Sequence, residues 1–324
     1  MPPPKRPPLR VPSHREVCSE AHRADLSPRL IVASGTPPAE VRVDEARVRA
    51  LLRDQHPDLA ERRLEIVESG FDNVMFRLGE DLAVRLPRRE IAGPLIVHEQ
   101  KWLPKLAARL PLSLPVPVRT GVPGQGYPFR WSVVPWLAGD PADRAAAKAS
   151  EASAWADFLL ALHRRAPDEA PKNPFRGVPV RDRKGSFDER FEILIKQSGA
   201  LPPLITGLWE RALSAPSACE PVWLHGDLHA RNVLVKDGRI SGVIDWGDLC
   251  AGDPATDLAS VWMLFDDEEA RARCLARYGA EKDLLLRAKG WAVFFGVMLA
   301  SLSDDSRHAA TGGATLGRLA ADAG

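Results

Sequence analysis

Apolar and polar residues alternate in three short runs that follow one another closely after residue 62. The runs are RLEIVESG, NVMFRLG and LAVRLP, and they are separated by Gly70 and by Gly79-Glu80-Asp81. Alternation with a period of two is typical of half-buried strands, and such glycines indicate turns. A helix is then predicted over 96–108, followed by extended chain over 115–121 and 129–137. This order indicates a small, mostly antiparallel sheet with one helix against it.

The pattern becomes helical beyond residue 139. In EASAWADFLLALHRRA, the apolar residues Trp155, Phe158, Leu159 and Leu162 recur at helical spacing. His163, beside this apolar stripe, is interpreted as a packed or capping residue rather than a ligand. Other helices are predicted at 44–55, 186–198, 201–214 and through 255–301.

These elements predict an α+β fold with two lobes that join near Val134–Gly139. The sheet-rich lobe is expected over 38–137 and a larger, mainly helical lobe over 138–324. Residues 1–37 are rich in proline, arginine and serine without periodicity, and are predicted to be a disordered tail.

Composition narrows the class of protein. The chain has 324 residues, of which 45% are hydrophobic, which is enough for a substantial core. Its formal net charge of +1 gives no reason to expect nucleic acid or an anionic membrane as a partner. Residues 201–324 hold 17 Asp and Glu against 12 Lys and Arg. This excess is compatible with a cationic small substrate and equally with solvated helix faces.

The four cysteines are scattered without CxxC spacing, which argues against a disulfide framework and against a thiolate zinc site. The N-terminus lacks the apolar segment of a secretory signal. No apolar run reaches the ~18 residues that a membrane-spanning helix needs. We therefore expect a cytoplasmic protein without a membrane partner.

The stretch LHGDLHARNVLVKDGRISGVIDWGD concentrates polar residues between apolar runs. Its Asp237-Gly238 pair between NVLV and ISGVID is a strong signal for a β-hairpin. A hairpin would bring Asn232, at the start of its first strand, close to Asp245, at the end of its second. Asp227 lies five residues before Asn232, on the loop that leads into the hairpin.

Several chemistries compete for this stretch. A zinc site built on His225, Asp227 and His229 lacks further ligands at suitable spacing. A nucleophilic mechanism lacks its serine or cysteine, and a glycosidase pair of Asp227 and Asp245 leaves Asn232 without a role. Phosphoryl transfer uses all three residues: an Asn and an Asp as Mg²⁺ ligands, and a separate Asp that orients a hydroxyl and accepts its proton.

The motifs HGDLHARNVLV and GVIDWGDLCAGDPATDLA resemble those of the aminoglycoside phosphotransferase family of small-molecule kinases. The resemblance extends from about residue 40 to the C-terminus. It implies a bilobal protein-kinase-like fold that uses a nucleoside triphosphate and Mg²⁺. It also implies Asp227 as the catalytic base, Asn232 and Asp245 as metal ligands, and His225, Asp253 and Asp257 as residues that order the loops.

The same resemblance implies nucleotide contacts in the first lobe. Ser69 and Gly70 would form the tip of a hairpin over the phosphates, with one glycine where protein kinases have three. Arg85 would replace the usual strand-three lysine and pair with Glu99 on the following helix. The alternative for Arg85 is an exposed arginine on an edge strand.

Two further expectations concern the same lobe. Arg88 and Arg89 are predicted to be solvated. Backbone groups near Val134 and Trp136 are expected to be available to adenine, although Pro135 between them has no N–H to donate.

The sequence thus predicts an O-phosphotransferase that uses ATP or GTP to phosphorylate a hydroxyl of a small molecule. The acceptor stays open between an aminoglycoside or other antibiotic and a metabolite such as a sugar or amino alcohol. A pseudokinase-like binding module is the third alternative, suggested by Arg85 and the thin glycine loop.

Overall fold

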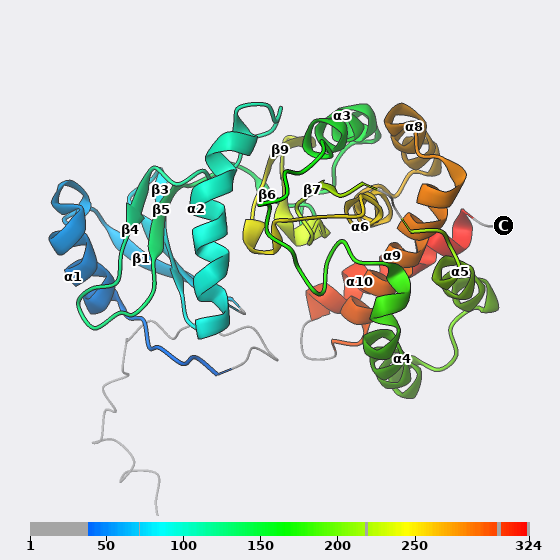
Figure 1. Ribbon diagram of the computed structural model, residues 1–324, viewed down its shortest axis with the longest axis horizontal. Coiled ribbons are helices and arrows are strands. Elements are labelled where there is room, and N and C mark those ends of the chain that lie inside the picture. Colours follow the sequence, from blue (N-terminus) through cyan, green and yellow to red (C-terminus); the bar gives the residue numbers. More distant parts are fainter. Residues whose placement is uncertain (1–37, 71, 218–219, 303–305, 323–324) are drawn as a thin grey trace, which may run out of the picture. The chain divides into compact units, whose positions relative to one another are not determined.

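A computed structural model of the chain describes residues 38–70, 72–217, 220–302 and 306–322. The predicted tail at 1–37 lies outside the described residues. The N-terminal part contains an antiparallel five-stranded sheet, and the C-terminal part is mainly helical (Figure 1). This arrangement confirms the predicted fold class.

The sheet has the strand order β1-β2-β3-β5-β4. Its first three strands coincide with the three alternating runs, and every neighbouring pair is antiparallel. The bounds of the strands are β1 Leu64–Ser69, β2 Asn73–Leu78, β3 Leu82–Pro87, β4 Arg119–Gly121 and β5 Trp131–Pro135.

Two helices cover this sheet, where the sequence predicted one (Figure 1). Helix α1 (Glu45–Gln55) begins where the Asp44 carboxylate accepts the N–H of Arg47 at 3.0 Å. It packs its apolar face on the side of the sheet that holds Phe76 and Val84. Helix α2 (Gly93–Ala107) begins three residues earlier than predicted. Because side chains alternate along a strand, Arg85 points to the opposite face from Val84, toward α2.

The C-terminal part holds the predicted helices and one that was not predicted. Helix α10 contains three glycines, which favour helix weakly, yet it packs closely against α9. A Cβ on Gly312 would lie 2.3 Å from the N atom of Ala300, so glycine is what permits this approach. The helices are α3 Ala152–Leu162, α4 Lys184–Ser198, α5 Pro203–Leu213, α6 Ala255–Leu258, α7 Ser260–Leu264, α8 Glu268–Tyr278, α9 Lys282–Ala300 and α10 Ser306–Ala321.

Two small sheets carry the polar stretch. Strands β8 (Val233–Lys236) and β9 (Arg239–Val243) form the predicted hairpin, and β6 (Asp140–Pro141) pairs with β8. Strand β7 (Val222–Leu224) pairs with β10 (Cys250–Gly252).

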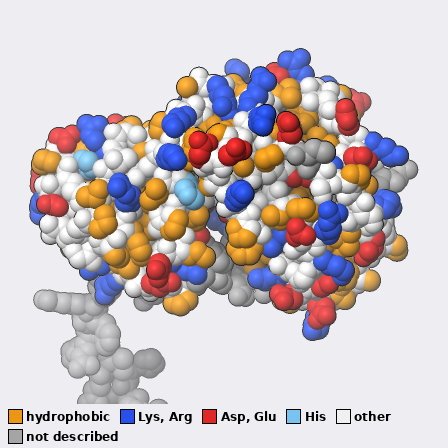
Figure 2. All heavy atoms as spheres, viewed as in Figure 1, with side chains coloured by type: hydrophobic (Ala, Val, Ile, Leu, Met, Phe, Trp, Pro, Cys, Tyr) orange, Lys and Arg blue, Asp and Glu red, His pale blue; other side chains and the backbone are white. Residues whose placement is uncertain are grey.

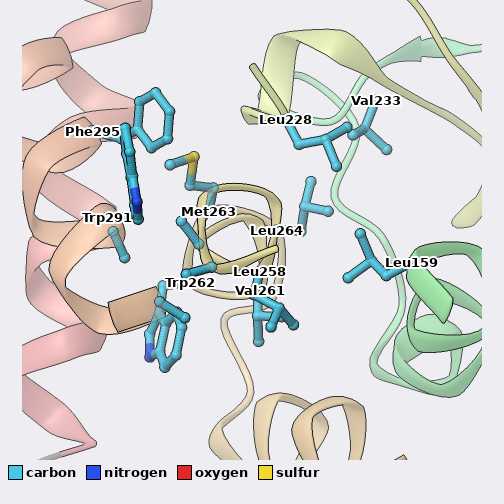
Figure 3. Close-up of a cluster of buried hydrophobic side chains, with 14 of the residues drawn as sticks. Leu159, Leu228, Val233, Leu258, Val261, Trp262, Met263, Leu264, Trp291 and Phe295 are labelled. Atoms are coloured by element: carbon cyan, nitrogen blue, oxygen red, sulfur yellow. The ribbon is translucent and has the colours of Figure 1, made fainter. Parts of the chain in front are cut away.

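Apolar side chains anchor this region to the helical core. Figure 3 shows Leu228 and Val233 on the side of Leu264, with Trp291 and Phe295 of α9 on the other side near Met263. The loop that carries Asp227 is therefore fixed by burial of its neighbour Leu228, which is 3% exposed. Within the part of the chain that the structure describes, no helix has both the length and the hydrophobicity needed to cross a bilayer.

Candidate active site

The pairing of β7 with β10 brings two halves of the polar stretch together. Leu224 lies opposite Cys250, so the chain leaving β7 at His225 runs beside the chain entering β10 at Asp248. Gly226 has φ +88°, and a Cβ there would lie 2.6 Å from the carbonyl oxygen of Asp248. Glycine is therefore required at this position both for its backbone conformation and for the close approach.

Asp257 and His225 hold the backbone of this loop. The Asp257 carboxylate, fully buried, accepts the N–H groups of His225 at 2.8 Å and Gly226 at 2.9 Å. Both ring nitrogens of His225 are also engaged: Nε2 bonds to the carbonyl of Ile244 at 2.9 Å, and Nδ1 accepts the N–H of Asp227 at 3.2 Å. His225 and Asp257 thus order the loop, as predicted, and His225 offers no free nitrogen to a zinc ion.

Asp253 and His163 also have structural partners. Asp253 accepts the N–H of Ala255 at 3.0 Å and forms a buried ion pair with Arg287 at 2.6 Å. His163 follows the last residue of α3, and its Nε2 lies 3.3 Å from Asp257. Both observations agree with the supporting roles predicted for these residues.

The hairpin places Asn232 beside the loop that carries Asp227. Asp237 and Gly238 occupy the left-handed region with φ +55° and +79°, which produces the tight turn. Ile244 donates its N–H to the carbonyl of Asn232 at 2.9 Å, which closes the open end of the hairpin. The Nδ2 of Asn232 donates to the backbone carbonyl of Asp227 at 2.9 Å. The predicted convergence of the loop and the hairpin is therefore confirmed for Asp227 and Asn232, and the convergence of the Asp245 side chain with them stays a prediction.

The Asp227 carboxylate lies between two basic side chains. Its Oδ2 is 3.3 Å from Nε2 of His229, and its Oδ1 accepts a hydrogen bond of 3.2 Å from Nη2 of Arg176. Burial alone would raise the pKa of Asp227, but the charges of His229 and Arg176 outweigh burial and hold the pKa well below its ordinary value. Asp227 is therefore an ionised acceptor at neutral pH.

Three residues of this cluster were missed by the sequence analysis. Arg176 and Asn173 lie in a loop-rich segment between two helices, and Asp248 lies within the quoted motif but was given no role. Asn173 donates to Asp248 at 2.7 Å, and Nε of Arg176 lies 3.6 Å from the same carboxylate. Burial, together with the charges of Asp227 and Asp245, raises the pKa of Asp248 against the opposing effect of Arg176. The NPFRG segment has no periodicity that could have revealed these contacts.

Arg85 joins the sheet to the hairpin. It lies on β3, an interior strand, and is only 7% exposed, so the alternative of an exposed arginine on an edge strand is wrong. Its Nη2 lies 3.2 Å from Glu99, as predicted, and 2.7 Å from Asp245. Burial raises the pKa of Glu99 to about 7 against the opposing charge of Arg85.

Asn232 and Asp245 fit the requirements of Mg²⁺. Asp245 has a left-handed backbone with φ +60°, and its side chain is 56% exposed even though Oδ1 bonds to Arg85. Among the described residues, the Oδ2 of Asp245 and the Oδ1 of Asn232 have no hydrogen-bond donor. Mg²⁺ is usually held in such sites by one or two protein oxygens, with phosphate and water completing its shell. The donor set therefore suits this ion.

Arginine side chains hold the segments on either side of the turn between β1 and β2. Gly70 donates its N–H to the carbonyl of Asn73 at 2.9 Å, and Arg88 donates to the carbonyl of Gly70 at 3.1 Å. Arg88 is only 4% exposed, and Arg89 pairs with Asp72 at 3.1 Å. The prediction that both arginines are solvated is wrong, because each holds a segment of this turn. A phosphate contact by Ser69 and Gly70 stays a prediction.

The chain after β5 also departs from expectation. Trp136 donates its N–H to the carbonyl of Asp81 at 2.8 Å, so this group is not available to adenine as expected. The guanidinium of Arg77 lies 4.6 Å from the centre of the Trp136 ring. Because hydrogen-bonding directions alternate along an antiparallel ladder, the carbonyl of Pro135 points away from β3.

Comparison with known proteins relates this site to a family. Residues 63–292 match the sequence model of the phosphotransferase enzyme family (APH). Viomycin phosphotransferase of Streptomyces vinaceus is 47% identical over 60 residues, which is 17% of this chain and 21% of that protein. Aminoglycoside 3'-phosphotransferase of Escherichia coli is 36% identical over 66 residues, which is 20% of this chain and 24% of that protein. The matched segments thus span about a fifth of these curated relatives.

Solved structures share the fold over most of the chain. The GDP complex of wild-type aminoglycoside 2'-phosphotransferase-IIIa has a TM-score of 0.60 at 20% identity, and the match covers 87% of this chain and 100% of that one. ADP-bound aminoglycoside phosphotransferase APH(2'')-Ib has a TM-score of 0.55 at 17% identity, and the match covers 86% of this chain and 99% of that one. At these identities the likeness shows the fold and not the substrate.

Proposed function

Because the chain belongs to the phosphotransferase enzyme family, we propose that it is a Mg²⁺-dependent kinase that phosphorylates a hydroxyl group of a small molecule. The observation that carries the proposal is the convergence of Asp227 with Asn232 through the hydrogen bond of 2.9 Å, at the mouth of a hairpin that also presents Asp245. The 38–137 segment would bind the nucleotide, and the 138–324 segment would supply catalysis and acceptor binding.

In the proposed reaction Asp227 accepts a hydrogen bond from the acceptor hydroxyl and aligns its oxygen with the γ-phosphorus. A carboxylate with so low a pKa is a weak base in the ground state, so proton transfer to it belongs late in the reaction. Asn232 and Asp245 would hold Mg²⁺, which neutralises charge on the phosphates when bound.

The nucleotide is proposed to contact the sheet. Arg85, steadied by Glu99, would bind an α- or β-phosphate, and Ser69 and Gly70 would cover the triphosphate. The carbonyl of Pro135, which points away from β3, would bind the base, whereas the backbone of Val134 pairs with Ala83 of β3 and would not. ATP or GTP is the proposed donor, because solved relatives are complexes with GDP and with ADP.

The acceptor is proposed from two candidate groups. Antibiotics come first, because two relatives are named for viomycin and for aminoglycosides. Metabolites with a hydroxyl group are the second group, because the fold alone does not specify the acceptor. A nucleotide-binding module without catalysis is disfavoured by the intact set Asp227, Asn232 and Asp245.

The test compares Asp227→Asn with the parent protein and with Asp157→Asn. Asp157 is a matched control because it forms an exposed ion pair with Arg277 at 2.8 Å. Nucleotide consumption with Mg²⁺ is measured over a panel of hydroxylated antibiotics and metabolites, and ATP and GTP binding by calorimetry. We expect Asp227→Asn to lower kcat at least ~10³-fold while binding nucleotide normally, since the residue acts on the acceptor.

The outcomes separate the alternatives. Turnover only on antibiotics supports the first acceptor group, and turnover only on metabolites supports the second. Nucleotide binding without turnover of any compound, and without slow transfer to water, would support the binding module. Parent-like rates in Asp227→Asn would contradict the proposed role of this residue.

A further inference from the structure

Arg176 connects the Asp227 carboxylate to Phe295, a buried aromatic residue of α9. Its Nη2 donates to Asp227 at 3.2 Å and its Nε lies 3.6 Å from Asp248. Its guanidinium carbon is also 5.2 Å from the centre of the Phe295 ring. The charge of Arg176 is therefore balanced by two carboxylates, and its guanidinium contacts both Asp227 and the Phe295 ring.

A second arginine contacts the adjacent buried aromatic residue of α9. Arg183 follows the NPFRG segment and has its guanidinium carbon 5.1 Å from the ring of Phe294 and 5.2 Å from the ring of Phe175. Its Nη2 donates to the Ser186 hydroxyl at 3.3 Å, and its Nε is buried with no hydrogen-bond partner in the described chain. Arg183 is 9% exposed and forms no ion pair with any described carboxylate.

The two arginines belong to one electrostatic environment. Phe294 and Phe295, which they contact, are successive residues of α9 with ring centres 5.7 Å apart. Burial first, and then the positive charge of Arg176, lowers the pKa of Arg183. An arginine side chain nevertheless stays charged at neutral pH. A buried cation without an anion is costly, so the arrangement favours an anion supplied from outside the chain.

The surface beside Arg183 is partly apolar. Phe175 is 54% exposed, although it is a large hydrophobic side chain and stands next to Arg176 in the sequence. Exposed aromatic rings next to a cation are suited to covering a ligand that has both a charged group and carbon atoms. On the face drawn in Figure 2, basic and acidic side chains are mixed. The overall charge of this face therefore does not select the charge of a ligand, and the local contacts of Arg183 would do so.

We infer that Arg183 binds an anionic oxygen group of the acceptor, either a carboxylate or a phosphate, with Phe175 covering the carbon skeleton beside it. The inference rests on the proposed function, because it places this group in the same molecule as the hydroxyl that Asp227 orients. A guanidinium matches the two oxygens of such a group through paired hydrogen bonds. Within the proposed acceptors, metabolites and acidic antibiotics are therefore favoured over a polycationic aminoglycoside, because the amines of an aminoglycoside would approach two arginines.

The acidic excess of residues 201–324 does not oppose this inference. Charges interact strongly only over a few ångströms when a surface is in salt solution. Of the acidic residues nearest to Arg176, Asp227 and Asp248 are already in contact with it, whereas Arg183 has no carboxylate contact in the described residues.

The first experiment measures kcat/KM with Mg²⁺ and ATP or GTP on matched acceptors. Each set keeps one hydroxylated skeleton and changes only the group at one end, as in gluconate, gluconamide, glucamine and glucitol 1-phosphate. Further sets use aromatic and peptidic hydroxy acids. Aminoglycosides are included as polycations. We expect the highest kcat/KM on an acid or a phosphate ester, and the comparison of these two arms identifies the anionic group.

The second experiment uses variants of the turn that carries Arg183. Arg183→Gln is expected to raise KM for the preferred anionic acceptor at least ~10-fold, with a smaller change in kcat. The ratio of kcat/KM for this acceptor to kcat/KM for the matching amide should fall to near one. Arg183→Lys retains the charge and should restore part of the preference. Arg181→Gln is the matched control, because Arg181 is exposed on the same turn and bonds to Ser217.

The result separates failure of this inference from failure of the proposed function. Highest turnover on amines or aminoglycosides, or an unchanged acid-to-amide preference in Arg183→Gln, would overturn the anionic acceptor and leave the kinase intact. Absence of phosphoryl transfer to every acceptor and to water would overturn both.

Discussion

Arg85 donates a hydrogen bond of 2.7 Å to Asp245, which lies 160 positions later in the chain. The same nitrogen is 3.2 Å from Glu99, so one buried cation is shared by a helix of the N-terminal part and the loop after the hairpin. The charges of Glu99 and Asp245 raise the pKa of Arg85 even though burial opposes them. The arginine is therefore a structural link as well as the proposed phosphate ligand.

Removing this cation alone should be costly. Arg85→Met leaves Glu99, which is 3% exposed, without its partner, and we expect the free energy of unfolding to fall by about 3 kcal/mol. The double variant Arg85→Met with Glu99→Leu removes both charges and should recover most of that loss. Urea denaturation measures both values. A double variant as unstable as the single one would show that unpaired Glu99 is not the cause.

Glu99 should make stability depend on pH. Its pKa rises from 4.5 to about 7 on folding, so between these values the folded state holds a proton more tightly than the unfolded state. This contribution is fully present below about pH 4.5 and is lost as the pH rises through about 7. We expect the parent to lose on the order of 2 kcal/mol more than Glu99→Gln between pH 4.5 and 8. Identical pH profiles for the two proteins would contradict this.

Asp257 should be more important for stability than an exposed aspartate. Asp257→Asn replaces one of the two acceptor oxygens by an NH2 group, so one of the N–H groups of His225 and Gly226 loses its acceptor. We expect a loss of about 2–4 kcal/mol together with reduced kcat. Asp266→Asn is the control, because Asp266 is 79% exposed in its pair with Arg318, and it should cost less than ~1 kcal/mol. If both variants lost the same free energy of unfolding, Asp257 would not be stabilising the loop.

Two glycine substitutions should have opposite effects. Gly226→Ala forces a Cβ to within 2.6 Å of the Asp248 carbonyl at a positive φ, and we expect a loss of about 2–4 kcal/mol and of activity. Gly313→Ala lies on the exposed face of α10 with no atom near its Cβ, and should raise stability by up to ~1 kcal/mol. Thermal unfolding distinguishes them, and a tolerated alanine at 226 would refute the close approach.

Much of the fold could be predicted because its signals are local. The alternation in Leu64–Pro87 and the Asp237-Gly238 turn depend on a few neighbouring residues, and the structure contains both the strands and the hairpin at these positions. The spacing of Asp227, Asn232 and Asp245 could be interpreted for the same reason: a hairpin with a tight turn has a predictable geometry.

Burial and pairing between distant segments could not be predicted in this way. Arg88 is buried on Gly70 rather than solvated, and the N–H of Trp136 bonds to Asp81 rather than remaining available. The glycine-rich α10 is a helix because α9 packs against it.

The contacts of Arg176 and Arg183 could not be predicted either, because they also join distant segments of the chain. In the sequence they are two arginines of a loop-rich segment, with no spacing that relates them to Asp227. Local alternation and turn chemistry are sufficient to indicate the strands and the hairpin. Which charged groups surround Asp227 depends on how segments more than 50 residues apart pack, because Arg176 reaches Asp227 across 51 positions and Phe295 across more than a hundred.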